Sequence, residues 1–189
     1  MIPAHRFLAR SSNRPAWLEA RAAGITATAV AKAATPSGFR DQLADMLHPV
    51  ETVDNDYMRF GRDNEPWLAD WLKVEHDLFA NEWLIASETN PRFMSTPDAL
   101  SLDHLVIGEI KTGGKEISKP PRVHVDQVQW QFLTTGAERS VYAYMKRSPD
   151  FQCEWFEPRT WEIRRNEKRI EELIDVAVRL LAQSEGQCA

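Results

Sequence analysis

Residues 108–114 read GEIKTGG, and residues 95–102, shortly before them, read STPDALSL. In a β-strand, residues i and i+2 point to the same face. A strand over 104–111 therefore places Glu109 and Lys111 on one side and leaves Ile110 to the core on the other. Burying a carboxylate and an ammonium together seldom stabilises a fold by itself. This pattern indicates a strand with a chemical role, and a surface strand carrying a Glu–Lys pair is the alternative if these residues are taken alone.

A hairpin turn at residues 103–104 would bring Asp98 back alongside Glu109. Two carboxylates, the backbone carbonyl of Ile110 and several waters form a plausible octahedral Mg²⁺ site. Such an ion activates water and neutralises charge that develops on a phosphodiester. Lys111 can orient or deprotonate the attacking water, or stabilise the phosphate. The residues by themselves predict a metal-dependent phosphodiesterase.

The remaining chain alternates helical and strand patterns, which predicts an α/β fold with a small central sheet flanked by helices. Helices are expected at 15–23, from Thr26 or Thr28 onward, at 39–47, within 58–77, at 124–135 and from about 160 to 182. Strands are expected at 83–88, 92–102, 104–111 and 140–147. Pro66 cannot donate to a helix ladder, so the helix within 58–77 should begin or kink there. Glu65 therefore lies at a junction, where its side chain can point away from the core.

Bulk properties limit the class of protein. The chain has 189 residues, 43% hydrophobic and 27% charged, as expected for one domain (1–189, core about 15–182). It has no long apolar run and no secretory signal, so a cytoplasmic location without membrane contact is expected. The net charge of −5 argues against nonspecific coating of nucleic acid, but it allows a local basic groove. The two cysteines, Cys153 and Cys188, cannot form a disulfide framework or an iron–sulfur site.

The spacing of Pro97–Asp98 and Glu109–x–Lys111 resembles the signature of the PD-(D/E)xK nuclease superfamily. Four stretches resemble, in family order, blocks of its lambda exonuclease/YqaJ-type viral recombinase family: AWLEARAAGITATAV (16–30), FGRDNEP (60–66), STPDAL (95–100) and DQVQWQFLTTG (126–136). The resemblance implies a restriction-endonuclease-like core with a small central mixed sheet. One departure is Ala99, which replaces the glycine common after the aspartate.

The resemblance also implies roles for individual residues. Asp98 and Glu109 correspond to the metal ligands and Lys111 to the catalytic lysine. Glu65 would support the metal site, through water if not directly. Gln127 would touch the lysine or the scissile phosphate.

One helical turn after Gln127, Gln131 faces the same way and is expected to contact DNA. Arg21, Thr26 and Thr28 match the family pocket for a terminal 5′-phosphate. A guanidinium beside hydroxyls at a helix N-terminus also suits an anion on physical grounds. Trp17 is expected to position Arg21.

The function implied by the resemblance is a Mg²⁺-dependent exonuclease, with Mn²⁺ as a second possible ion. It would digest duplex DNA 5′ to 3′ from phosphorylated ends during phage-type recombination. The implied partners are double-stranded DNA, a single-strand annealing protein and two further copies of the chain in a ring-shaped trimer. Two alternatives remain open: a RecB-like end-processing or nicking nuclease, and an inactive DNA-end-binding module of the same fold.

Other polar residues carry two interpretations. Lys115, Lys119 and Arg122, in the segment 112–122, either meet DNA phosphates or form a solvated basic loop. His104 and His124 have no second ligand at metal spacing, so a turn residue and a helix-end residue are expected.

Overall fold

The computed structural model describes residues 1–49 and 53–186. Helices are η1 (Ala4–Arg6), α1 (Arg14–Ala22), α2 (Ala27–Ala33), α3 (Pro36–Leu47), α4 (Asp56–His76), α5 (Arg122–Thr135) and α6 (Glu167–Gly186). Strands are β1 (Phe7–Arg10), β2 (Ile25–Thr26), β3 (Phe79–Ala80), β4 (Trp83–Ala86), β5 (Phe93–Ser95), β6 (Ala99–Leu100), β7 (Val106–Gly113), β8 (Arg139–Lys146) and β9 (Arg159–Arg164). This is a mixed α/β fold, as the sequence predicts.

The strands form two mixed sheets where the sequence predicts one. The five-stranded sheet has the order β3-β6-β7-β8-β9, and only its β7–β8 pair is parallel. The four-stranded sheet has the order β1-β4-β5-β2. The expected strand over 92–102 is divided between them, because β5 and β6 pair with different neighbours on either side of Pro97. The chain crosses between the sheets immediately before Asp98.

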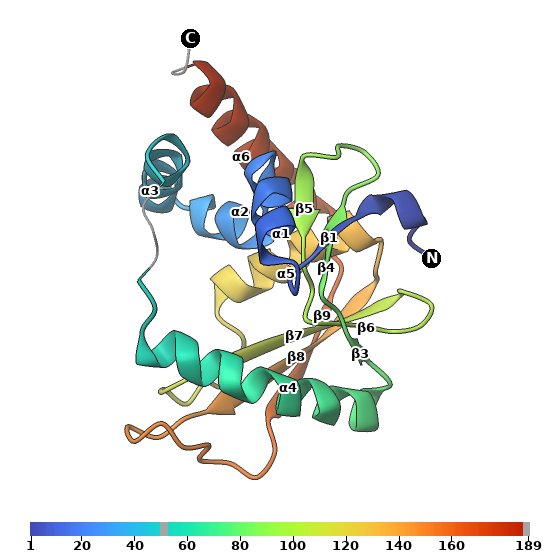
Figure 1. Cartoon of the computed structure of the whole chain (residues 1–189), viewed down its shortest axis with the longest axis vertical. Helices are drawn as coiled ribbons and strands as arrows, with labels where there is room; N and C mark the ends of the chain where they lie inside the picture. The colour runs from blue at the N-terminus through green and yellow to red at the C-terminus, as the bar shows by residue number, and fades with distance from the viewer. Residues whose placement is uncertain (50–52, 187–189) are drawn as a thin grey trace.

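Helices cover both faces of the five-stranded sheet. Leu68 and Leu72 of α4 pack with Ile110 on one face, and Val128 and Phe132 of α5 pack with Ile107 on the other. Figure 1 shows α4 along the lower side of this sheet, with α1, α2, α3 and α6 gathered above it. Glu109 and Lys111 alternate with Ile110, so they share the face of β7 that α5 covers. The charged pair thus lies between strand and helix.

The expected final helix from about 160 is wrong in its first part. Residues 159–164 form β9, in which Ile163 is buried and Trp161 half-buried while their neighbours are exposed. This alternation has the period of a strand, and Ile163 pairs with Ser140 of β8. The helix begins only at Glu167, after Asn166, whose side chain accepts the N–H of Arg169 over 3.0 Å. The seven-residue spacing of Ile163 and Ile170 suggested a helix that the sheet overrides.

The helix containing Pro66 does not begin there, which was one of the two expectations, because α4 is continuous over 21 residues. Its start is fixed by Asn55, whose side chain accepts the N–H of Met58 over 3.0 Å. The helix predicted at 124–135 ends as expected, since Gly136 takes the left-handed conformation that closes α5. Among the described helices, none is both long and apolar enough to cross a membrane.

Candidate active site

The end of β6 places Asp98 beside β7. The register pairs Ala99 with Gly108, so Asp98 lies next to Glu109, as the hairpin argument predicts. The Ile110 N–H donates to Oδ2 of Asp98 over 2.6 Å. Within a strand, the N–H and C=O of one residue point to the same side. The carbonyl of Ile110 therefore also faces the Asp98 side, where β6 no longer covers β7.

Glu109 is the most enclosed charged residue of the site, with no exposed surface. Its Oε1 accepts hydrogen bonds from Lys111 Nζ and, over 2.6 Å, from Gln127 Nε2. Its Oε2 accepts one from Gln131 Nε2 over 2.6 Å. A buried carboxylate is costly unless donors surround it, and these three donors meet that need. Two of them come from one face of α5, four residues apart.

These bonds bear on two of the sequence expectations. Gln127 donates a hydrogen bond to the Glu109 carboxylate, which Lys111 also contacts. Gln131 has no exposed surface, so it cannot reach DNA as expected, and it acts on Glu109 instead. The sequence spacing correctly placed both on one face, but it did not show that this face turns inward.

Neighbouring acids change the titration of the site. Burial and the charge of Glu109 raise the pKa of Asp98 well above its usual value. Burial would lower the pKa of Lys111, but the carboxylates of Glu109 and Asp98 outweigh it and raise that pKa overall. Burial raises the pKa of Glu65, and the opposing effect of the Lys111 charge is partly offset by the charge of Glu109. The charge of Glu109 disfavours ionisation of both Asp98 and Glu65, so a cation placed among these carboxyl groups is stabilising.

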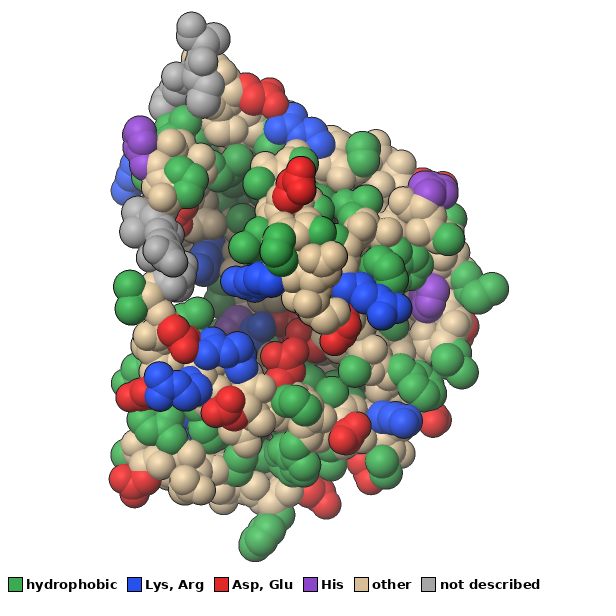
Figure 2. Space-filling model, in the orientation of Figure 1, with side chains coloured by type: hydrophobic (Ala, Val, Ile, Leu, Met, Phe, Trp, Pro, Cys, Tyr) green, Lys and Arg blue, Asp and Glu red, His purple; other side chains and the backbone are tan. Residues whose placement is uncertain are grey.

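Glu65 lies on α4, within electrostatic reach of Lys111 and Glu109, and it lines a hollow between α4 and α1. A cavity of about 720 Å³ is lined here by Arg14, Asp54, Met58, Gly61, Arg62 and Glu65. Figure 2 shows the hollow in this face, with basic side chains above it and acidic side chains below. Arg62 is held by Asp54 through bonds of 2.9 and 2.6 Å. Arg14 forms no ion pair within the described residues.

Two arginines enclose Trp17 on α1. The guanidinium carbons of Arg14 and Arg21 lie 5.0 and 4.2 Å from the centroid of the Trp17 ring. Burial, and then the charge of Arg14, lowers the pKa of Arg21. Among the described residues Arg21 has no ion pair, and the buried Trp17 Nε1 has no hydrogen-bond partner. Two uncompensated cations beside an unpaired N–H donor make a site suited to an anion.

The two threonines lie where the sequence predicts, at the start of α2. Thr26 occupies the N-cap position without a side-chain capping bond, and Thr28 is exposed in the first turn. No hydrogen bond joins either hydroxyl to Arg21 in the part of the chain that the structure describes. In the basic segment, Lys119 and Arg122 line a second hollow, of about 530 Å³, together with Lys168.

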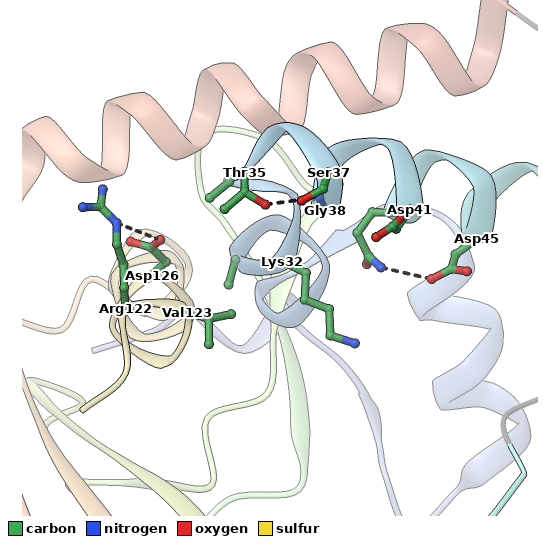
Figure 3. A pocket seen from close by; sticks show the side chains of 12 residues that line it. Lys32, Thr35, Ser37, Gly38, Asp41, Asp45, Arg122, Val123 and Asp126 are labelled. Atoms are coloured by element: carbon green, nitrogen blue, oxygen red, sulfur yellow. Dashed lines mark hydrogen bonds and ion pairs between the residues drawn. The ribbon is translucent and has the colours of Figure 1, made fainter. Parts of the chain in front are cut away.

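A further cavity, of about 560 Å³, lies between α2, α3 and α5. Figure 3 shows Lys32 and Arg122 at this cavity together with Asp41, Asp45 and Asp126, so charges of both signs line it. None of the carboxylates near Lys111 lines it. Glu65, one of those carboxylates, instead lines the hollow between α1 and α4, so we associate the site with that hollow.

The donor set at Asp98 fits a hard divalent cation. Asp98 and Glu109 offer carboxylate oxygens, and Ile110 offers a carbonyl on the same side. No three His, Cys, Asp or Glu side chains of the described residues are grouped closely enough to hold one ion. With two carboxylates, the ion would keep several waters, as Mg²⁺ does in proteins.

The sequence interpretation missed one residue of this site, His124. Its ring lies within electrostatic reach of Lys111 and Glu109, and its Nδ1 lies 2.6 Å from the hydroxyl of Tyr142. Its spacing of three residues before Gln127 was a signal, because i and i+3 share a helix face. Tyr142 stands directly opposite Glu109 in the β7–β8 register.

Comparison with models of protein families gives no match, and comparison with curated protein sequences gives none either. Solved structures do match. The alkaline exonuclease LHK-Exo from Laribacter hongkongensis is 22% identical, with a TM-score of 0.76 over 90% of this chain and 92% of that chain. LHK-Exo in complex with dAMP gives a TM-score of 0.77 at the same identity and coverage.

A phage-related exonuclease from Haemophilus somnus 129PT gives a TM-score of 0.67 at 13% identity, over 88% of this chain and 96% of that chain. The chain thus shares the fold of alkaline and phage-related exonucleases. This agrees with the resemblance seen in the sequence, and the expected nuclease-like α/β fold is confirmed.

Proposed function

We propose that this protein is a divalent-metal-dependent DNA exonuclease that digests duplex DNA 5′ to 3′ from phosphorylated ends. The observation that carries the proposal is the grouping of Asp98, Glu109 and Lys111 at the uncovered edge of β7, within a fold shared with exonucleases. The dAMP bound to LHK-Exo is a deoxynucleoside monophosphate, the class of product that stepwise digestion of DNA releases.

Asp98, Glu109 and the Ile110 carbonyl would hold Mg²⁺, or Mn²⁺ in its place. The ion supplies a Lewis acid for the phosphate and a water of lowered pKa. Lys111 keeps its charge, since the surrounding carboxylates raise its pKa, and therefore serves as a cation for the phosphate rather than as a base. Gln127 and Gln131 fix the orientation of Glu109.

The 5′ polarity rests on the arginines at Trp17. Arg21 and Arg14 both stack on the Trp17 ring and together offer an anion site on α1, and Arg14 lines the same hollow as Glu65 of α4. A terminal phosphate on Arg21 would place the first phosphodiester toward the carboxylates. The hydroxyls of Thr26 and Thr28 are available as further donors.

Assembly and partners extend the proposal by resemblance. A subunit with a net charge of −5 has little basic surface to retain duplex DNA over many turnovers. A ring of three copies would retain the duplex topologically, and cyclic symmetry allows such a closed ring. A single-strand annealing protein would take up the strand left by digestion. Light scattering with and without DNA measures the mass, which we expect to be near three subunits, and a monomer in both conditions would exclude the ring.

The deciding assay uses linear duplex with 5′-phosphate or 5′-hydroxyl ends and closed-circular duplex, each with Mg²⁺, Mn²⁺ or EDTA. We expect metal-dependent loss of the linear substrates, faster from 5′-phosphate, with the circle intact and purified Asp98→Ala inactive. Nicking of the circle would favour the RecB-like alternative. Binding of phosphorylated ends without any cleavage would favour the inactive end-binding module.

A further inference from the structure

His124 and Tyr142 form a hydrogen-bonded pair on the α5 face of the sheet. His124 lies in the first turn of α5, three and seven residues before Gln127 and Gln131, so all three side chains share one helix face. Its Nδ1 lies 2.6 Å from the Tyr142 hydroxyl, and the two rings are stacked at 5.7 Å with an interplanar angle of 29°. Since Gln127 and Gln131 both donate to Glu109, this face of α5 is directed at the site.

The pair fixes the tautomer of the imidazole. Tyr142 has no exposed surface, and its hydroxyl has no other hydrogen-bond partner in the part of the chain described. A buried O–H left without an acceptor is costly, so the phenol donates and Nδ1 accepts. The proton of a neutral His124 is then on Nε2.

The Nε2–H is free to meet a ligand. Within the described residues no hydrogen bond engages Nε2, and it is not one of the enclosed polar atoms that lack a partner. Burial, and then the charge of Lys111, lowers the pKa of His124 to about 4, so the ring is neutral near neutral pH.

We propose that His124 is a substrate-contacting residue, whose Nε2–H donates to a non-bridging phosphate oxygen of the strand that is cut, and that Tyr142 is the positioning residue that holds the required tautomer. This inference rests on the proposed nuclease function. A phosphate oxygen is the acceptor of choice because the adjacent Lys111 and carboxylates act on that same group. An uncharged N–H donor stabilises the negative charge that develops on the phosphate, and it does not compete with the metal ion for Glu109.

Two amide variants separate this role from a structural one. The amide nitrogen of glutamine reaches the position of Nε2, whereas that of asparagine reaches only the position of Nδ1. We expect His124→Gln to keep most of kcat on 5′-phosphorylated duplex, and His124→Asn and His124→Ala to lose about 10²-fold, as for other donors to reacting oxygens. KM should change little, because other contacts bind the end. Tyr142→Phe should lose a smaller factor in kcat, since both tautomers then become populated.

A higher kcat for His124→Asn than for His124→Gln would overturn the proposal. If His124 only satisfied Tyr142, His124→Asn would be the better replacement, and the losses would appear in Tm with kcat unchanged. Wild type and Asp98→Ala, run in parallel, show whether the nuclease function itself holds.

A readout independent of cleavage uses nitrogen NMR of the histidine side chains between pH 6 and 8. We expect the Nε2–H tautomer for His124 in the free protein and a shift of its Nε2 resonance on adding phosphorylated duplex in EDTA. An Nδ1–H tautomer, or an Nε2 resonance unmoved by bound DNA, would refute the proposal whether or not the protein cuts DNA.

Discussion

Gln131 donates a hydrogen bond to Oε2 of Glu109 over 2.6 Å, and neither side chain has any exposed surface. The helix α5 thus supplies a donor to a carboxylate on β7 from inside the protein. The other oxygen, Oε1, accepts from Lys111 and Gln127 on the side toward the hollow. One end of Glu109 is therefore fixed by the fold, and the other takes part in the site.

Replacing Gln131 with leucine should reduce both stability and turnover without weakening DNA binding. The substitution leaves Oε2 of Glu109 without its donor, which costs about 1–3 kcal/mol of unfolding free energy. Denaturant unfolding, kcat and DNA affinity in EDTA measure the three effects. Gln129→Leu is the matched control, because Gln129 is also buried on α5 but bonds to Arg164 and Asn166. Gln129→Leu should lose stability and keep kcat. A loss of DNA affinity in Gln131→Leu would instead support the direct contact between Gln131 and DNA that the sequence suggested.

Asp98→Asn should abolish cleavage and yet stabilise the metal-free protein at pH 8. A carboxyl whose pKa is higher in the folded than in the unfolded state binds protons more tightly when folded, so its ionised form costs stability above that pKa. The amide removes this charge and can still accept the Ile110 N–H. Tm should rise by a few degrees, since 1 kcal/mol corresponds to about 2–4 °C for this chain length.

Mg²⁺ should raise the Tm of the wild type and leave that of Asp98→Asn unchanged. Asp126→Asn provides the contrast, because Asp126 is paired with Arg169 through two bonds of 2.7 Å. It should lower Tm and keep the response to Mg²⁺. A wild-type Tm indifferent to Mg²⁺ and Mn²⁺ would contradict the metal site.

Cleavage should decline on acidification at a higher pH than ordinary carboxyl groups would give. Asp98 and Glu65 both have raised pKa values, and a protonated carboxyl cannot ligate a cation. The rate should therefore rise with pH through the raised pKa values, and more Mg²⁺ should restore activity at the acidic end. Glu65→Gln removes one of the repelling charges and should move the acidic limb to lower pH. Glu75→Gln, an exposed acid further along α4, should leave the profile in place.

Arg21→Ala should remove the preference for 5′-phosphorylated ends by slowing that substrate alone. A charge-assisted contact of about 1.5–3 kcal/mol corresponds to roughly 10- to 150-fold in kcat/KM. Arg14→Ala should give a partial loss, because Arg14 lies farther from the Trp17 ring than Arg21 does and is exposed. Arg10→Ala is the control: Arg10 also stacks on a tryptophan, at 4.7 Å from the Trp83 centroid. Equal loss on 5′-hydroxyl ends would show a general role in DNA binding instead.

Several elements could be predicted because their determinants are local. The period of two in 106–111 and the helical spacing of Gln127 and Gln131 each fix which side chains share a face. Pro15 and Gly136 mark helix ends through their own backbone preferences. Where local signals conflict with sheet pairing, the prediction fails. Residues 159–164 join β8, although Ile163 also suits a helix.

The sequence by itself determined that Asp98, Glu109 and Lys111 meet at one strand edge, since a short hairpin and the alternation of side chains require it. Only the tertiary structure decided that Glu109 is fully enclosed and what encloses it. Its two glutamine partners lie 18 and 22 residues further along the chain, and His124 finds Tyr142 at a separation of 18. Such contacts depend on how α5 packs across β7 and β8. That packing is set by the burial of apolar side chains over the whole sheet, which no short stretch of sequence records.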